Sequence, residues 1–94
     1  MALALAREWT EQGIIIEEIK LPGEQPHYYL SDKDNPCNMA VFQPNWSDGR
    51  YADGWLVVND WELMVLKKSV PDAITAFSRW LNKGHRRLDK DCRA

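Results

Sequence analysis

The sequence has few of the residues on which catalytic and metal sites depend. Among 94 residues there are two histidines and two cysteines, Cys37 and Cys92, and there is no CxxC motif. Two cysteines so far apart are too few for a disulfide-stapled scaffold, so we expect two reduced thiols and a cytoplasmic location. Glycine-rich phosphate-binding loops of either standard spacing are absent as well, which leaves nucleotide hydrolysis without support.

Long apolar runs are also missing. The longest apolar stretches, residues 55–58 and 63–66, have the length of strands and fall far short of the ~18 residues needed to cross a bilayer. Arg7 and Glu8 interrupt the apolar start before the hydrophobic part of a secretory signal is complete. We therefore expect a soluble protein that is neither exported nor bound to a membrane.

The composition is that of a folded domain. Apolar residues make up 45% of the chain, charged residues 28%, and five residues are tryptophan. At this length one hydrophobic core is expected, so we predict a single domain over residues 1–84 and a basic, fraying tail over residues 85–94. Residues 1–66 hold four Lys and Arg against eleven Asp and Glu, whereas residues 67–94 hold eight against three. This asymmetry bears on binding partners rather than on the fold.

Hydrophobic periodicity predicts an α+β fold with an N-terminal helix, a central antiparallel sheet of four to five strands and a C-terminal amphipathic helix packed on the sheet. Residues 2–12 are rich in helix formers and precede Gly13, a good C-terminal cap, although an edge strand is the alternative. Strands are expected over 14–21, 27–31 and 38–43, where Pro44 ends the third. Residues 55–67 fit two strands joined by a tight turn, or one long bulged strand.

The C-terminal helix carries the clearest local signals. Ser69 is placed as an N-cap, Pro71 lies in the first turn, and Asp72 follows the serine by three residues. Gly84 marks the expected end of this helix. Apolar residues at helical spacing then predict a face that packs on the sheet.

Residues 45–54 are expected to form the longest loop, because they contain Asp48-Gly49 and Asp53-Gly54. Trp55, Trp61, Phe42 and Phe77 have the strand or helix context of core residues. The aromatic residues of the loop do not have this context, and loops on a rigid scaffold often carry binding residues. The predicted protein-contact residues are Trp46, Asp48, Arg50, Tyr51 and Asp53; the alternative is that Trp46 folds back over the sheet edge.

A second candidate surface is basic. Positive side chains near the C-terminus would neutralise phosphates and give salt-dependent nucleic-acid binding. The candidate contacts are Lys83, Arg86, Arg87, Lys90 and Arg93. Asp89 and Asp91 interrupt this stretch, and cations near a helix C-terminus are favoured by the helix dipole alone, so a solvated tail is the competing interpretation.

Other chemistry is weakly supported. His27 and Cys37 are the best candidates for a small hydrolase, but no orienting third group accompanies them. Residues 32–35 resemble the start of a calcium loop, yet the required glycine and closing glutamate positions hold Cys37 and Gln43. A turn rich in Asp and Asn explains residues 32–35 without a metal ion. We therefore expect no catalytic residue, metal or cofactor in this protein.

The sequence thus favours a small non-enzymatic protein-binding module that acts as an inhibitor or adaptor by covering a partner's surface. Phage and bacterial inhibitors such as anti-CRISPR and immunity proteins work in this way. The acidic body predicts a protein partner with a basic surface. A nucleic-acid-binding protein is the alternative, and the sequence leaves a homodimer open because edge strands invite pairing.

Overall fold

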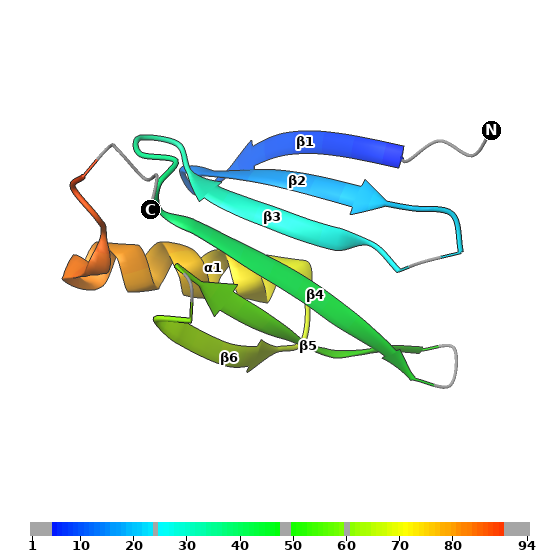
Figure 1. The fold of residues 1–94 in the computed structure, drawn as a ribbon. Helices are drawn as coiled ribbons and strands as arrows, with labels where there is room; N and C mark the ends of the chain where they lie inside the picture. The colour runs from blue at the N-terminus through cyan, green and yellow to red at the C-terminus, as the bar shows by residue number, and fades with distance from the viewer. Residues whose placement is uncertain (1–4, 24, 48–49, 60, 90–94) are drawn as a thin grey trace.

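A computed structural model describes residues 5–23, 25–47, 50–59 and 61–89. Within these ranges six strands form one antiparallel sheet, and each strand lies beside the one that precedes it in the sequence (Figure 1). The strands are β1 (Leu5–Glu11), β2 (Ile14–Lys20), β3 (His27–Asp32), β4 (Met39–Ser47), β5 (Arg50–Val58) and β6 (Leu63–Lys67). β1 and β6 are therefore the edges of the sheet.

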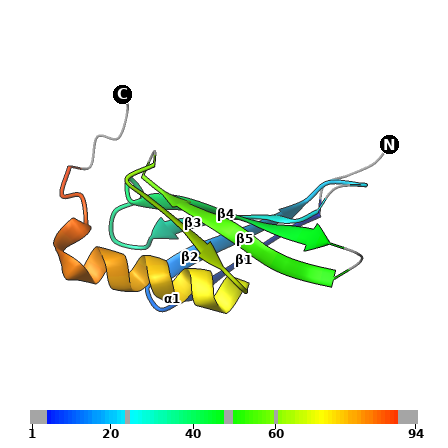
Figure 2. The ribbon, with the colours of Figure 1, turned by 90° about the horizontal axis from the view of Figure 1, so that it is seen from below.

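One helix, α1 (Val70–Trp80), lies against one face of the sheet, and the other face has no helix over it (Figure 2). The hydroxyl oxygen of Ser69 accepts a 3.2 Å hydrogen bond from the backbone N–H of Asp72, which confirms the predicted N-cap. α1 continues into a π-helical turn, Leu81–His85, where Gly84 adopts a φ of 98°. The α+β class and the C-terminal helix are thus confirmed. No helix in the described part of the chain is long and apolar enough to span a bilayer.

The core fills the space between α1 and the covered face. Every second residue of β2 to β5 points toward the helix, and Ile74, Phe77 and Leu81 meet them from α1 and the turn that follows it. Phe42 and Phe77 are fully buried, as predicted. Replacing either with alanine should cost about 3–5 kcal/mol.

The predicted N-terminal helix is wrong. Residues 5–11 form the edge strand β1, which pairs with β2 through a hairpin turn at Gln12 and Gly13, both with positive φ. Trp9 lies opposite Ile16 and packs against the core. Cross-strand pairing and burial of the indole outweigh the helix propensity of alanine and glutamate, which is worth only tenths of a kcal/mol per residue.

The predicted loop over residues 45–54 is also wrong, because β4 and β5 continue into a long hairpin. The register shifts between Gln43 and Asn45, so Pro44 sits in a β-bulge and needs no ladder hydrogen bond. Gly54 lies directly against it, and a Cβ at this position would collide with the backbone of Pro44. The bulge lengthens two strands that were already expected, and the count of six, where four or five were expected, comes from β1 in place of the predicted helix. Of the two alternatives for residues 55–67, two strands joined by a turn is the one observed.

The segment after the helix is anchored to the β3–β4 loop. The backbone N–H of Arg87 donates to the side-chain oxygen of Asn38 at 2.7 Å, and the Asn38 amide donates back to the Arg87 carbonyl at 3.1 Å. The amide of Asn35 donates to the carbonyls of Arg87 and Asp89. Residues 87 and 89 are therefore hydrogen-bonded to the β3–β4 loop. The division into a domain over residues 1–84 and a fraying tail stays a prediction, and residues 90–94 lie outside the described ranges.

Cys37, in the same loop, is disulfide-bonded, so the expectation of two reduced thiols is wrong. The other cysteine of the sequence, Cys92, lies outside the described residues. Disulfides persist mainly in oxidising compartments. The cysteines therefore give no support to a cytoplasmic location, which stays a prediction.

Candidate functional site: the open face of the sheet

The face of the sheet opposite α1 is apolar and uncovered by any described element. We call it the open face and define it by the side chains of Tyr29, Met39, Val41, Trp55, Val57, Trp61, Met64 and Leu66, all exposed or half-buried. An antiparallel sheet with one solvated face usually carries polar residues there. A contiguous apolar surface on a small domain instead marks a site of interaction.

Strand register explains how these side chains come together. Val41, Val57 and Met64 lie in one row across β4, β5 and β6, and Tyr29 extends the row onto β3. Gln43, Trp55 and Leu66 form the next row. Their sequence neighbours point the other way into the core, because side chains alternate along a strand.

The two rows border a shallow depression of about 470 Å³, lined by Val41, Gln43, Trp55, Val57, Trp61 and Met64. Two of its walls are indole rings, and the amide of Gln43 adds a polar group. Among the residues that the structure describes, no lysine, arginine, aspartate or glutamate lines it. The depression therefore suits an apolar side chain of a partner rather than a phosphate or a metal ion.

Trp61 is the most exposed ring of the open face. It lies in the β5–β6 turn with a φ of 77° and with 69% of its surface exposed. The left-handed region is unfavourable for a bulky residue, so the turn places an exposed indole on the open face at a conformational cost.

The turn that carries Trp61 is fixed by Asn59. The side-chain oxygen of Asn59 accepts a 2.9 Å hydrogen bond from the backbone N–H of Met39, and the Asn59 N–H donates to the Met39 carbonyl at 2.9 Å. Asn59 is buried and has a φ of 44°, which asparagine tolerates better than most residues. This clamp ties the turn to β4, so Trp61 and Met39 are presented on one rigid frame.

An acidic margin flanks the apolar part of the face. Glu17 lies opposite Tyr29 across β2 and β3, and Glu8 lies opposite Glu17 across β1 and β2. Both glutamates are exposed. Beside the open face, β1 and β2 thus add the two carboxylates of Glu8 and Glu17, together with the half-buried Ile15 and Ile19.

The open face differs from the predicted contact site. Trp55 and Trp61 were expected in the core, and this is wrong: both are exposed. Sequence reasoning missed Trp55 because both side-chain rows of β5 are apolar over residues 55–58, so alternation does not distinguish the two faces. The expected N-terminal helix also hid the open face, because two helices can cover both faces of a sheet and the single helix α1 covers one.

The predicted loop residues lie on the long hairpin. The backbones of Trp46 and Tyr51 pair across β4 and β5, and Arg50 is the first residue of β5. Asp53 is exposed on β5, and Asp48 lies outside the described residues. A contact role for this group stays a prediction.

Three of the candidate nucleic-acid contacts lie within the described residues, and a nucleic-acid role for them stays a prediction. The Nε of Arg86 donates to the buried carboxylate of Asp32 at 2.7 Å, so its charge is already paired. Arg87 is exposed, and Lys83 lines a groove on the helix side of the sheet. Lys90 and Arg93 lie outside the described residues.

The hydrolase candidates are not supported either. A disulfide-bonded Cys37 has no thiolate with which to attack a substrate. Asp32, the first residue of the calcium-like segment, accepts from the backbone N–H of Asp34 at 3.1 Å and pairs with Arg86, as expected of a structural turn. Comparison of the chain with protein-family models, curated proteins and solved structures gives no match.

Proposed function

We propose that the protein is a non-enzymatic protein-binding module that acts as an inhibitor or adaptor by covering a partner's surface with its open face. The observation that carries the proposal is the apolar, uncovered surface of β4 to β6, with Trp55 and Trp61 exposed on it. Tryptophan, tyrosine and methionine are enriched in protein interfaces. The mode of action is that of phage and bacterial inhibitors such as anti-CRISPR and immunity proteins.

The size of the open face suits a specific complex. A stable interface buries about 800 Å² on each partner, and a large aromatic side chain contributes about 150–250 Å² when buried. Trp55, Trp61 and their aliphatic neighbours together are therefore enough for the centre of such an interface. Hot-spot tryptophans typically contribute at least ~2 kcal/mol, which is about 30-fold in affinity.

The acidic margin narrows the class of partner. A protein with an apolar patch bordered by lysine or arginine would place its cations over Glu8 and Glu17. Opposite charges at the rim of an interface speed association and select partners more than they add affinity. Binding should therefore slow as salt rises, while the apolar contact persists.

Nucleic acid is a weaker fit to the same face. Exposed aromatics do stack on bases, but single-strand binders combine them with a positive groove that neutralises phosphates. No cation of the described residues lines the depression between Trp55 and Trp61, and the neighbouring strands add glutamates. The acidic surroundings of the depression therefore favour a protein partner over a nucleic acid.

The test uses affinity capture with three forms of the tagged chain: wild type, the open-face variant Trp61→Ser/Met64→Ser, and Leu88→Ser. Leu88 is 88% exposed and follows the helix outside the six strands, so it is a matched control for the loss of an exposed apolar side chain. We expect a nuclease-resistant protein on the wild type and on Leu88→Ser that is missing from the open-face variant.

Two results would contradict the proposal. Equal capture by all three forms would mean that the open face is not the contact. Light scattering that shows a dimer for the wild type and a monomer for the open-face variant, with no captured partner, would assign the face to a second copy of the chain.

A further inference from the structure

We propose that the groove between β6 and α1 binds an extended acidic segment of a protein partner, which adds to the sheet as a strand beside β6. This groove lies on the opposite side of the sheet from the open face. The inference goes beyond the proposed function, because it concerns a different surface and a different recognition chemistry.

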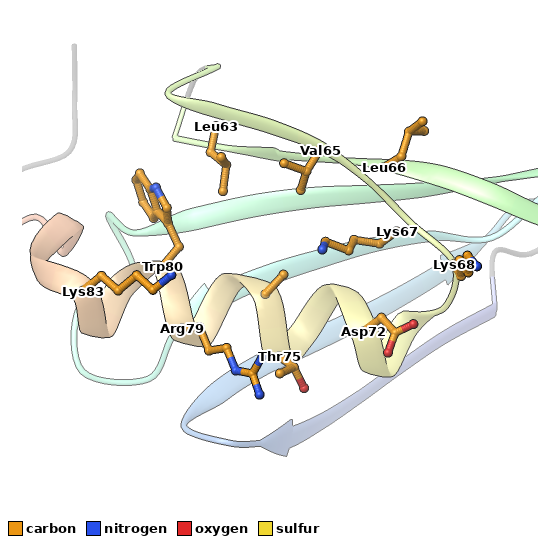
Figure 3. Close-up of a pocket in the computed structure, with 11 residues that line it drawn as sticks. Leu63, Val65, Leu66, Lys67, Lys68, Asp72, Thr75, Arg79, Trp80 and Lys83 are labelled. Atoms are coloured by element: carbon orange, nitrogen blue, oxygen red, sulfur yellow. The ribbon is translucent and has the colours of Figure 1, made fainter.

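The groove has a volume of about 590 Å³ and is walled by β6 on one side and α1 on the other (Figure 3). Leu63, Val65 and Trp80 supply its apolar lining. The side chain of Lys67 lies in the space between the strand and the helix, whereas Leu66 points away from the helix. Lys83 stands beside Trp80 at the far end.

The charge of the groove is strongly positive. Four of its lining residues are cations and one is an acid, Asp72; the cations are Lys67, Lys68, Arg79 and Lys83. None of the four forms an ion pair with another residue in the described part of the chain. A carboxylate entering the groove would therefore meet cations that are not already neutralised.

The backbone of β6 offers the second element of recognition. Within the described ranges β6 pairs with β5 alone, so every second residue turns its N–H and C=O groups away from the sheet. An unpaired edge is a template for another strand, and peptide ligands use such edges in β-augmentation. Lysines at an edge also discourage uncharged strands, so Lys67 and Lys68 make this edge selective for an acidic one.

Strand geometry predicts which residues of the ligand face which surface. Alternate side chains of an added strand point to opposite faces of the sheet. One set would enter the groove near Lys67 and Lys83, and the other would continue the open face beside Met64 and Leu66. The best ligand is therefore a segment in which acidic and apolar residues alternate. A nucleic acid would satisfy the cations but not the strand edge, which is why a peptide is favoured.

The test is an NMR titration of the full chain with a short peptide of alternating Glu and Val. The expected result is a set of shifts in the amides of β6 and the facing side of α1. Lys67→Glu should weaken binding about tenfold, the value of one charge-assisted contact. Lys20→Glu is the matched control, because Lys20 is exposed on β2 and outside the groove, and it should bind as the wild type does.

Three control ligands decide the chemistry. The same peptide with Lys in place of Glu, and an N-methylated form that cannot pair with a strand, should both fail to shift β6. Equal binding of either peptide, or tighter binding of a single-stranded oligothymidylate that is also lost in Lys67→Glu, would overturn the proposal. Trp61→Asn should leave the titration unchanged, so failure of this site and failure of the open face are distinguishable.

Discussion

Replacing Trp61 with asparagine should separate its part in binding from its part in folding. The φ of 77° places Trp61 in the left-handed region, which costs an ordinary residue about 1–2 kcal/mol and an asparagine much less. The substitution therefore removes most of that strain. It also removes the packing of the part of the side chain that is buried.

The lost packing can be estimated from exposure. With 69% of the residue exposed, roughly a third of the ~150–250 Å² that a buried aromatic covers is removed from water. At about 25 cal/mol per Å² this is about 1–2 kcal/mol, which is an upper value because the unfolded chain also buries some surface. The free energy gained by relieving the backbone strain and the free energy lost with the packing therefore nearly cancel. The free energy of unfolding of Trp61→Asn should lie within about 1 kcal/mol of the wild type.

Urea denaturation followed by far-ultraviolet circular dichroism measures this difference without relying on tryptophan fluorescence. Phe77→Ala, a fully buried ring on α1, serves as the comparison and should lose about 3–5 kcal/mol. Affinity for the captured partner should instead fall by about 30-fold in Trp61→Asn. A loss of more than about 2 kcal/mol of stability would show that Trp61 holds the fold together, and unchanged affinity would show that it makes no contact.

Three further outcomes test the structure itself. Gly54→Ala should lower the urea midpoint by the equivalent of about 2 kcal/mol or more, because the added Cβ would collide with the backbone of Pro44 and force the bulge to shift. An unchanged urea midpoint would contradict the packing of the bulge. Asn38→Ala should cost about 1–3 kcal/mol and speed tryptic cleavage at Arg87, whose backbone it anchors; equal cleavage rates would contradict the anchoring. In the denatured protein, Cys37 should react with a thiol reagent only after reduction, and prompt reaction of two thiols would refute the disulfide.

The C-terminal helix could be predicted because its signals are local. The cap at Ser69 and the apolar spacing of α1 depend on residues close in the sequence, and the structure reproduces both. β1 could not be predicted in this way, since its strand conformation depends on pairing with β2 and on burying Trp9 against the core. Local propensity favoured a helix there, and a tertiary contact decided otherwise.

The long β4–β5 hairpin shows a second limit. Pro44 and Gly54 each signal the end of a strand when taken alone, yet they lie against one another and make a bulge together. Because Pro44 and Gly54 are far apart in the sequence, a prediction that considers one short segment at a time cannot detect their contact. The expectation of a loop at residues 45–54, and of a contact site on it, followed from treating the two signals as independent.

The open face was hidden for a different reason. The alternation of β4 was visible, with Met39 and Val41 on one side and Ala40 and Phe42 on the other, but both sides are apolar. Which row faces the helix is set by packing volumes, with the fully buried Phe42 beneath α1, and not by polarity. Trp55 and its neighbour Leu56 are likewise both apolar, and Leu56 is the one that lies in the core.

Oxidative footprinting of the complex with the captured partner tests the central claim most directly. The extents of oxidation of Trp55, Trp61 and Met64 would be compared between the free and the bound protein, with Trp9 as the internal control. Trp9 packs against the core on the helix side of the sheet and lines neither proposed binding site. We predict strong protection of the three open-face residues and unchanged oxidation of Trp9. Protection of Trp9 without protection of the other three would contradict the assignment of the open face as the binding surface.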